Sequence, residues 1–327
     1  RVWLDTYADS FNAAHDAITL SQPDARVMIS LDHHFGTAFD TPAATRPLLS
    51  GETFLLGLDA RTGGRDWRVA FHPYPPNLLA PGFSALDYPK VTFGNVGVVV
   101  GWLHATFPGN PERQEVHLTE QGINALSPSS EGAQATQLCA AFRNITGTPG
   151  IVSFQYHRMT DHPTEVAIGL GLGLRRADGS ARPAWSTWAL VNRNDLNPPQ
   201  LDCGFEHLPS TRLVRGFRGG WGHRASTRDL PTGFVEEQVY RLERSEQPGT
   251  TLLFECEVGD HSLLTADPGC EGLPPLGPVG WIHDLPGAGR VELRRCFIPS
   301  TGDHFISPDA ACEGHTVEQS LGFALPG

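Results

Sequence analysis

The chain has 327 residues and a formal net charge of -12 at pH 7. This negative charge argues against a nucleic acid as partner, because binding to phosphates depends on clustered Lys and Arg. No apolar run approaches the roughly 20 residues needed to cross a bilayer, so we expect no membrane partner. The length allows two domains of roughly 100 to 200 residues each, and the acidic balance favours a neutral substrate.

The N-terminal part of the chain alternates between helix and strand patterns. Apolar residues spaced three and four apart, from Trp3 to Ile18, predict an opening helix that ends before Gln22. The elements predicted after it are a strand at 26–32, a helix around 47–60, a strand at 67–72, a helix around 95–107, a strand at 114–119, a helix around 131–145, a strand at 150–156 and a helix through Trp185 to Val191. This alternation predicts parallel strands joined by helices.

The number of strands suggests which α/β architecture to expect. A complete eight-stranded (β/α)8 barrel takes roughly 250 residues, whereas residues 1–195 offer four strands. We therefore interpret residues 1–195 as the second half of such a barrel, strands 5 to 8, preceded by one helix. An open, doubly wound α/β sheet is the alternative.

The composition changes at Leu196, and residues 196–204 are typical of a linker. Three similar segments follow within residues 205–327, beginning at Gly222, Gly259 and Gly302. A repeat of roughly 40 residues that occurs three times predicts an all-β module with threefold repetition, such as a β-trefoil. Propeller blades are the alternative for such a repeat.

Five of the six cysteines lie in this later part of the chain. Two pairs each bracket a Gly-Asp-His turn, which predicts disulfides between Cys256 and Cys270 and between Cys296 and Cys312. Such clustering favours a secreted protein, extracellular or periplasmic, although reduced buried thiols are the alternative. Cys139, on the apolar face of a predicted helix, is expected to be a buried free thiol, and Cys203 has no obvious partner.

Four predicted strands end on polar side chains. Because the carboxyl ends of parallel strands converge, we expect these side chains on one rim. They are Asp32, His33 and His34, then His72 and Tyr74, then Glu120, and finally Gln155, Tyr156 and His157. A carboxylate with neighbouring donors is typical of the nucleophile of a retaining glycosidase. We expect Glu120 to take this role and His72 and Tyr74 to orient it, with an exposed or capping glutamate as the alternative.

The remaining polar residues of the rim suit the binding of sugar hydroxyls. We expect substrate contacts from these residues: Asp32, His33, His34, Gln121, Asn124, Gln155, Tyr156 and His157. This interpretation implies a carbohydrate substrate and neither a cofactor nor a metal. One alternative is a metal-dependent hydrolase that uses Asp32, His33, His34, His72, His157 and His162 as ligands. Another is a non-catalytic carbohydrate-binding protein that uses the C-terminal repeats.

Five segments resemble the signature blocks of a family of largely uncharacterised bacterial TIM-barrel domains, which is similar to the clan A glycoside hydrolases. They are Ser30–Phe35, Ala70–Pro75, Val91–Asn95, Leu118–Asn124 and Ser153–His162. The resemblance implies that Glu120 ends the seventh strand, where that clan has its nucleophile. It also implies that Asp32 to His34 end the fifth strand, His72 and Tyr74 the sixth, and Gln155 to His157 the eighth.

The acid/base of that clan is the Glu of an Asn-Glu pair at the end of the fourth strand, and the sequence shows no counterpart of this pair. We therefore expect the acid/base in an N-terminal half barrel that was removed or lies on a separate polypeptide. The alternative is a natural half barrel with Asp32 as the acid. Residues 205–327 resemble lectin-like repeat modules of secreted bacterial hydrolases. Together these features predict a secreted glycoside hydrolase of polysaccharides or oligosaccharides whose catalytic machinery is incomplete in this fragment.

Overall fold

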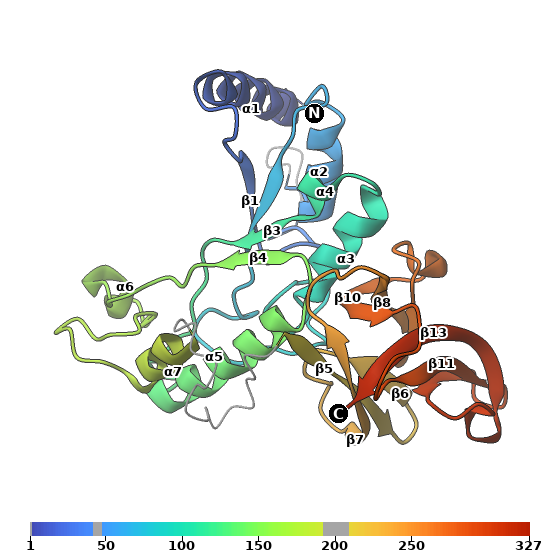
Figure 1. Cartoon of the computed structure of the whole chain (residues 1–327). Helices are drawn as coiled ribbons and strands as arrows, with labels where there is room; N and C mark the ends of the chain where they lie inside the picture. The colour runs from blue at the N-terminus through green and yellow to red at the C-terminus, as the bar shows by residue number, and fades with distance from the viewer. Residues whose placement is uncertain (1, 42–47, 192–208) are drawn as a thin grey trace.

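A computed structural model describes residues 2–41, 48–191 and 209–327 (Figure 1). It combines helices and a four-stranded parallel sheet with a nine-stranded antiparallel sheet formed by the later residues. The predicted mixed α/β class with a parallel sheet and a separate antiparallel part is therefore confirmed. The predicted linker, residues 196–204, lies outside the described residues. None of the helices in the described ranges is long and apolar enough to span a membrane.

The four strands of the parallel sheet match the four predicted strands. They are β1 (Met28–Asp32), β2 (Arg68–His72), β3 (Val116–Leu118) and β4 (Ile151–Phe154). They lie side by side in the order β1-β2-β3-β4, and each pairs in parallel with the next. Successive parallel strands in sequence order place their connecting helices on the same face of the sheet, because such crossovers have one handedness.

Seven helices accompany this sheet within the described residues. They are α1 (Val2–Ser21), α2 (Gly51–Asp59), α3 (Gly97–Thr106), α4 (Pro111–Gln114), α5 (Glu131–Thr146), α6 (Pro163–Ala167) and α7 (Pro183–Val191). Two begin at serine N-caps: Ser50 Oγ accepts from the Thr53 N–H at 3.2 Å, and Ser130 Oγ accepts from the Ala133 N–H at 3.1 Å. The core contains fully buried side chains from the strands and from α3, namely Ile29, Val69, Phe71, Val116, Leu118, Val99, Val100 and Leu103.

The antiparallel sheet consists of three similar units of three strands. The first is β5 (Ser210–Arg218), β6 (Gly222–Ser226) and β7 (Val235–Glu243); the second is β8 (Thr250–Val258), β9 (His261–Thr265) and β10 (Pro275–His283); the third is β11 (Val291–Ile298), β12 (Asp303–Ser307) and β13 (Thr316–Pro326). In each unit the first strand pairs with the other two. The third strands, β7, β10 and β13, also pair with one another, so the units meet around a common centre.

The strand pairing shifts the second repeat by one residue relative to an alignment on the histidines His223, His261 and His304. His223 and His304 hold equivalent places, opposite Phe217 and Phe297. His261 lies opposite Val258, at the place that Asp303 takes in the third unit. The repeated glycine and histidine residues therefore predicted the three hairpins correctly, but they did not predict the strand register within each hairpin.

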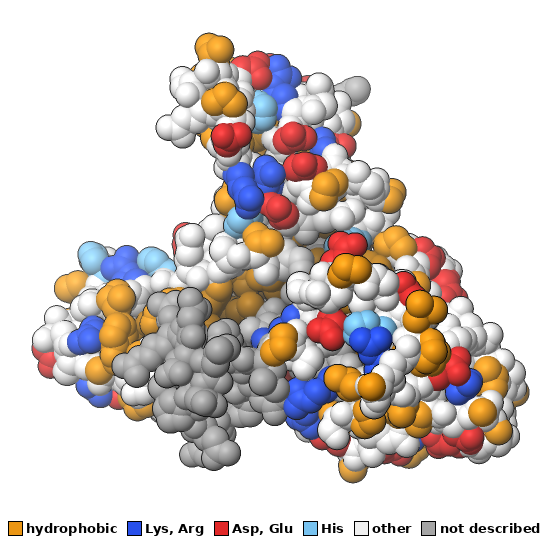
Figure 2. All heavy atoms as spheres, viewed as in Figure 1, with side chains coloured by type: hydrophobic (Ala, Val, Ile, Leu, Met, Phe, Trp, Pro, Cys, Tyr) orange, Lys and Arg blue, Asp and Glu red, His pale blue; other side chains and the backbone are white. Residues whose placement is uncertain are grey.

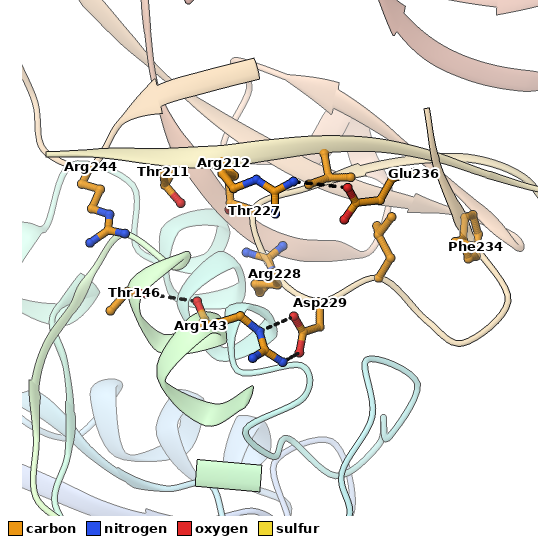
Figure 3. Close-up of a pocket in the computed structure, with 12 residues that line it drawn as sticks. Arg143, Thr146, Thr211, Arg212, Thr227, Arg228, Asp229, Phe234, Glu236 and Arg244 are labelled. Carbon is orange, nitrogen blue, oxygen red and sulfur yellow. Dashed lines mark hydrogen bonds and ion pairs between the residues drawn. The ribbon is translucent and has the colours of Figure 1, made fainter. Parts of the chain in front are cut away.

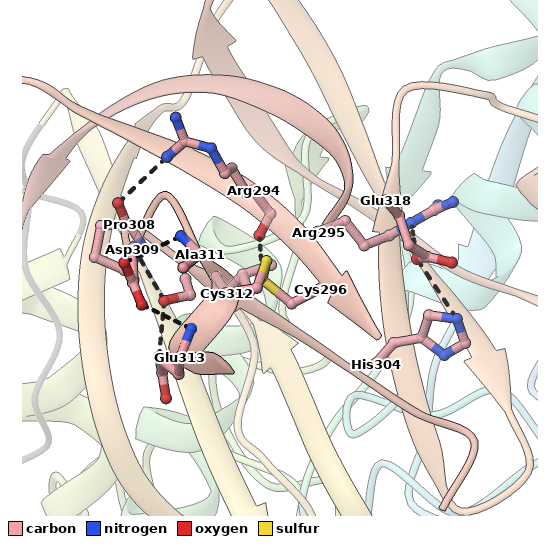
Figure 4. Close-up of a disulfide and its surroundings, with 12 residues drawn as sticks. Arg294, Arg295, Cys296, His304, Pro308, Asp309, Ala311, Cys312, Glu313 and Glu318 are labelled. Atoms are coloured by element: carbon pink, nitrogen blue, oxygen red, sulfur yellow. Dashed lines mark hydrogen bonds and ion pairs between the residues drawn. A yellow bond between two sulfur atoms is a disulfide. The ribbon is translucent and has the colours of Figure 1, made fainter. Parts of the chain in front are cut away.

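Both predicted disulfides are confirmed, with Cα atoms 5.6 Å apart in each. They hold two short 3-10 turns, Cys270–Gly272 and Cys312–Gly314, in which Glu271 and Glu313 have positive φ angles of 55° and 56°. An aspartate before each turn binds it, since Asp309 accepts from the Glu313 N–H at 2.7 Å (Figure 4). Left-handed backbone is unfavourable for residues other than glycine, so the disulfide and the aspartate jointly maintain it.

These turns join neighbouring units by ion pairs. Arg295 Nη1 donates to Glu271 of the second unit at 2.6 Å, and Arg215 Nη1 donates to Glu313 of the third at 2.7 Å. The first and second units are joined instead by Arg228 and Glu255, a buried pair at 2.7 Å. Each boundary between units thus has its own Arg–Glu pair.

The prediction that Cys139 is a free thiol is wrong. This residue is disulfide-bonded, and no described cysteine is free. Its exposed fraction of 8% fits a buried half-cystine as well as a buried thiol, so the helical pattern could not separate the two. Cys203 lies outside the described residues.

The antiparallel sheet docks on the helical part through α3 and α5. A Cβ atom on Gly277 of β10 would lie 2.3 Å from the carbonyl oxygen of Gly97, so the backbones touch directly. Arg143 of α5 forms an ion pair with Asp229 at 2.8 Å, and the Asp229 N–H donates to Asn144 Oδ1 at 2.8 Å. His104 of α3 packs edge-on against Phe254 of β8, with ring centroids 5.3 Å apart.

We predict that His104 makes stability depend on pH. Burial lowers the pKa of His104 to about 4, against an ordinary value of 6.5 in the unfolded chain. The neutral ring therefore contributes stability above pH 6.5 that is lost as the pH falls towards 4. The free energy of unfolding of the wild type should fall as the pH is lowered from about 7.5 to 4.5. In His104→Phe this fall should be smaller by on the order of 2 kcal/mol, as measured by urea denaturation at each pH. The exposed His315→Asn variant is the control, and an unchanged pH dependence in His104→Phe would contradict the prediction.

Candidate active site

The strand register places the predicted rim residues in one row. Asp32 pairs with His72 across β1 and β2. Phe71 pairs with Leu118, which brings Thr119 next to His72, and Leu118 pairs with Phe154, which brings Gln155 next in the row. The carboxyl ends of all four strands therefore converge, as predicted from their sequence pattern.

Glu120 lies one residue beyond this row and is exposed. The Tyr74 hydroxyl donates to Glu120 Oε1 at 3.1 Å, so a residue that follows β2 fixes a carboxylate that follows β3. Burial, followed by the charge of Glu120, raises the pKa of Tyr74 well above its usual range. The phenol therefore remains a hydrogen-bond donor to the carboxylate at physiological pH.

His72 lies beside this pair and interacts with hydroxyl groups. Its Nε2 atom lies 3.1 Å from Thr119 Oγ1 and 3.5 Å from Ser30 Oγ. Burial lowers the pKa of His72, and the charges of Glu120 and Asp32 oppose this effect only in part. His72 is thus a neutral ring that is linked to the Glu120 loop through Thr119.

The three residues at the end of β1 have different surroundings. Asp32 is exposed, and its Oδ1 accepts from the His34 N–H at 2.8 Å and lies 3.1 Å from His34 Nδ1. His33 is only 7% exposed, and burial lowers its pKa to about 4. Asp32 therefore faces the rim with His34 as its support, while His33 belongs to the interior.

Gln121, Asn124 and Tyr156 lie beneath the Glu120 loop. Gln121 is fully buried, and its amide donates to the carbonyls of Leu118 and Gln155. Asn124 joins the loop to two other segments, because its Nδ2 donates to Leu79 O at 2.9 Å and its Oδ1 accepts from the Gly171 N–H at 2.8 Å. The Tyr156 hydroxyl accepts from the Ile123 N–H of the loop at 3.1 Å. We expected these three residues to contact substrate, but the hydrogen bonds of their side chains go to the backbone, which gives them a positioning role, and only Gln121 Oε1 is buried without a partner among them.

Sequence reasoning missed a fourth member of this buried network. Gln134 of α5 is fully buried and donates to Ile123 O at 2.9 Å and to Tyr156 Oη at 3.4 Å. The available signal was a polar residue on the helix face that otherwise carries Leu138 and Phe142. A glutamine at such a position requires buried partners. The Glu120 loop supplies an acceptor for its amide N–H group, while Gln134 Oε1 receives no hydrogen bond within the described residues.

Beyond β4, His157 turns back to the loop of Glu120. Its N–H donates to Gln121 O at 2.8 Å, and its Nε2 lies 3.6 Å from Glu165 Oε1. Arg158 binds the same Glu165 oxygen at 3.2 Å. Gln155 is exposed at the end of β4, as expected for a group that could meet a ligand. Arg158 and Glu165 were not identified from the sequence, because nothing in their local pattern separates them from surface charges.

The alternative function, a metal-dependent hydrolase, requires a cluster of ligands. Within the described part of the chain, no three His, Cys, Asp or Glu side chains are arranged to hold a metal ion. His162, one of its six candidates, caps α6 by accepting from the Thr164 N–H at 3.3 Å.

Two adjoining cavities, of about 800 Å³ and about 390 Å³, lie between α5 and the first antiparallel unit and not at the rim. Their charged side chains face one another, with Arg143 paired to Asp229 and Arg212 paired to Glu236 at 3.2 Å (Figure 3). The Arg143–Asp229 pair ties α5 to the first antiparallel unit, whereas Arg212 and Glu236 both belong to that unit, on β5 and β7. The cavities thus belong to the docking interface.

Residues 1–197 match the model of a family of unknown function (DUF5722), and the chain belongs to this family. Among solved structures, the chain is similar to a family 39 glycoside hydrolase from the gut symbiont Bacteroides cellulosilyticus WH2, with 14% sequence identity and a TM-score of 0.41. The likeness covers 98% of this chain and 55% of that one, so the chain spans about half the length of that hydrolase. No curated protein matches the chain. The geometry of the rim is therefore the basis for a functional proposal.

We predict that Asn124 is needed to hold the Glu120 loop. Asn124→Ala should lower the free energy of unfolding by about 2 to 4 kcal/mol, because it leaves several buried backbone groups without partners. Gln155→Ala, at an exposed position of the same rim, should change it by less than about 0.5 kcal/mol. Chemical denaturation of both variants measures the difference, and equal stabilities would show that the loop does not depend on Asn124.

Proposed function

We propose that the chain carries the nucleophilic half of a retaining glycoside hydrolase, with Glu120 as the nucleophile. The observation that supports this best is the hydrogen bond from Tyr74 to Glu120 on a rim formed by four parallel strands. Glu120 is exposed, so a substrate can reach it, while one of its oxygens is fixed. A nucleophilic carboxylate needs this combination of access and orientation.

In this reaction Glu120 attacks the anomeric carbon as the bond to the leaving-group oxygen breaks, and water later releases the sugar from the covalent intermediate. Tyr74 orients the attacking carboxylate and stays protonated throughout. His72, neutral and linked through Thr119, positions the start of the loop. Asp32, held by His34, and Gln155 present polar groups to the hydroxyls of a polysaccharide or oligosaccharide.

The polar face of the parallel sheet supports the proposal that further βα units complete a barrel. Ser30 and Asp32 are exposed on this face, whereas the opposite face is covered by helices and apolar. Parallel sheets are normally covered on both faces. We propose that a half barrel, in the same or a separate polypeptide, covers this face.

The antiparallel units support a second role. We propose that they form a β-trefoil-like module that braces the helical part, because glycine backbones and the Arg143–Asp229 pair make the contact close. The two disulfides support export to an oxidising compartment, extracellular or periplasmic.

The decisive variant is Glu120→Gln, which removes the nucleophile with little change in shape. In the intact enzyme, which includes the proposed second half barrel, we expect the loss of hydrolysis of aryl glycosides together with an unchanged unfolding transition. Tyr74→Phe should lower kcat by about 10- to 100-fold, since it removes one oriented hydrogen bond. Glu246→Gln, at an exposed carboxylate in a turn, is the matched control and should leave hydrolysis unchanged. Activity of Glu120→Gln equal to that of the wild type would refute the assignment.

A further inference from the structure

Glu165 is a second carboxylate beside the rim, and it comes from a segment that the function proposed above does not use. It lies on α6, in the connection that follows β4. In the space-filling view, His and Lys or Arg side chains gather on this part of the surface, around α6 (Figure 2). The charge of Glu165 is therefore embedded in a basic neighbourhood within an acidic protein.

Two contacts bring this segment to the Glu120 loop, and a third brings it to the loop of Tyr74. The His157 N–H donates to Gln121 O at 2.8 Å, one residue after Glu120. Glycine is required at position 122, because a Cβ atom there would lie 2.2 Å from the carbonyl oxygen of His157. Beyond α6, Gly169 lies against Leu79, since a Cβ atom on this glycine would be 3.6 Å from Leu79 Cδ2, so the segment also reaches the loop of Tyr74.

The two oxygens of Glu165 have different environments. Oε1 is bound by Arg158 at 3.2 Å and lies 3.6 Å from His157 Nε2. Oε2 is shielded from water and receives no hydrogen bond from the described residues. A buried hydrogen-bond acceptor that has no donor costs free energy, and the cost is higher when the acceptor is an oxygen of a charged carboxylate. The side chain as a whole is 24% exposed, so a donor from outside can reach Oε2 once the carboxylate rotates.

Glu165 is also close enough to Tyr74 for its charge to act there. Together with burial and Glu120, Glu165 contributes to the raised pKa of Tyr74. One phenol therefore interacts with both carboxylates, one that follows β3 and one that follows β4. Through His157, which lies 3.6 Å from Glu165 and donates to Gln121 O, Glu165 is on the side of the rim that carries the Glu120 loop.

We propose that Glu165 is a substrate-binding residue that accepts a hydrogen bond from a sugar hydroxyl in the subsite next to Glu120. Arg158 and His157 hold Oε1, and the hydroxyl supplies the donor that Oε2 lacks. The terminal torsion of a glutamate is soft, so a small rotation presents Oε2 to the ligand. This inference rests on the proposed glycosidase function and adds a specificity-determining residue to it.

The test compares wild type, Glu165→Gln, Glu120→Gln and the control Glu246→Gln on a panel of 4-nitrophenyl glycosides. Glu165→Gln should raise KM about tenfold or more with kcat within about threefold, because it weakens a charged hydrogen bond formed equally in ground and transition states. Arg158→Met should give a smaller rise in KM. The best glycoside is also tested in forms that each lack one hydroxyl. Wild type should have a higher KM for the form that lacks the hydroxyl bound by Glu165, whereas Glu165→Gln alone should have the same KM with and without that hydroxyl.

Binding gives a second readout that does not need turnover. β-Linked tetrasaccharides of glucose, xylose and mannose are titrated calorimetrically into Glu120→Gln and into Glu120→Gln/Glu165→Gln, and the second variant should bind about tenfold more weakly. If Glu120→Gln abolishes hydrolysis while Glu165→Gln matches wild type in KM and binding, this inference is wrong and the proposed function stands. Undiminished hydrolysis by Glu120→Gln, or no hydrolysis and no binding by the intact wild-type enzyme that includes the proposed half barrel, overturns both.

Discussion

The parallel register of β1 to β4 is the constraint on which the candidate site depends. It places Asp32, His72, Thr119 and Gln155 side by side although they are far apart in sequence. The register is fixed by the apolar face, where Ile29, Val69 and Val116 are completely buried, because a shift of one residue would turn these side chains towards the polar face. The position of every polar group on the rim thus follows from the packing of apolar groups on the opposite face of the sheet.

A buried polar network gives the site its precision. Ile123 anchors the loop after β3 in the hydrophobic core, and the amides of Gln121, Asn124 and Gln134 and the Tyr156 hydroxyl hold its backbone. The amide N–H groups and the hydroxyl find partners, although Gln121 Oε1 and Gln134 Oε1 receive no hydrogen bond within the described residues, and the bonds that form favour one loop conformation. Glu120 can remain exposed because the fully buried Gln121, Asn124 and Gln134 and the partly buried Tyr156 hold its loop.

The sequence was sufficient to predict the parallel strands, the rim, the place of Glu120 and two disulfides, because these depend on periodicity, strand ends and loop-bracketing cysteines. The sequence did not allow us to predict in which direction the side chains beyond a strand end point. Asn124 and Tyr156 were expected to face a ligand, yet they face the backbone, since loop geometry is set by distant residues such as Gly171 and Gln134. The short helices α4 and α6 were missed for the same reason, and with them the pairing of Glu165 with Arg158.

The burial of Asn144 has a consequence for any eukaryotic host used to produce the protein. Asn144-Ile-Thr forms an N-glycosylation acceptor sequence, but the Asn144 side chain is only 1% exposed, with its amide donating to Phe93 O and its carbonyl accepting from Asp229. A glycan attached to the nascent chain would occupy the space in which α5 meets the first antiparallel unit. Modification and correct assembly at this asparagine therefore exclude each other, and a host without this pathway avoids the conflict.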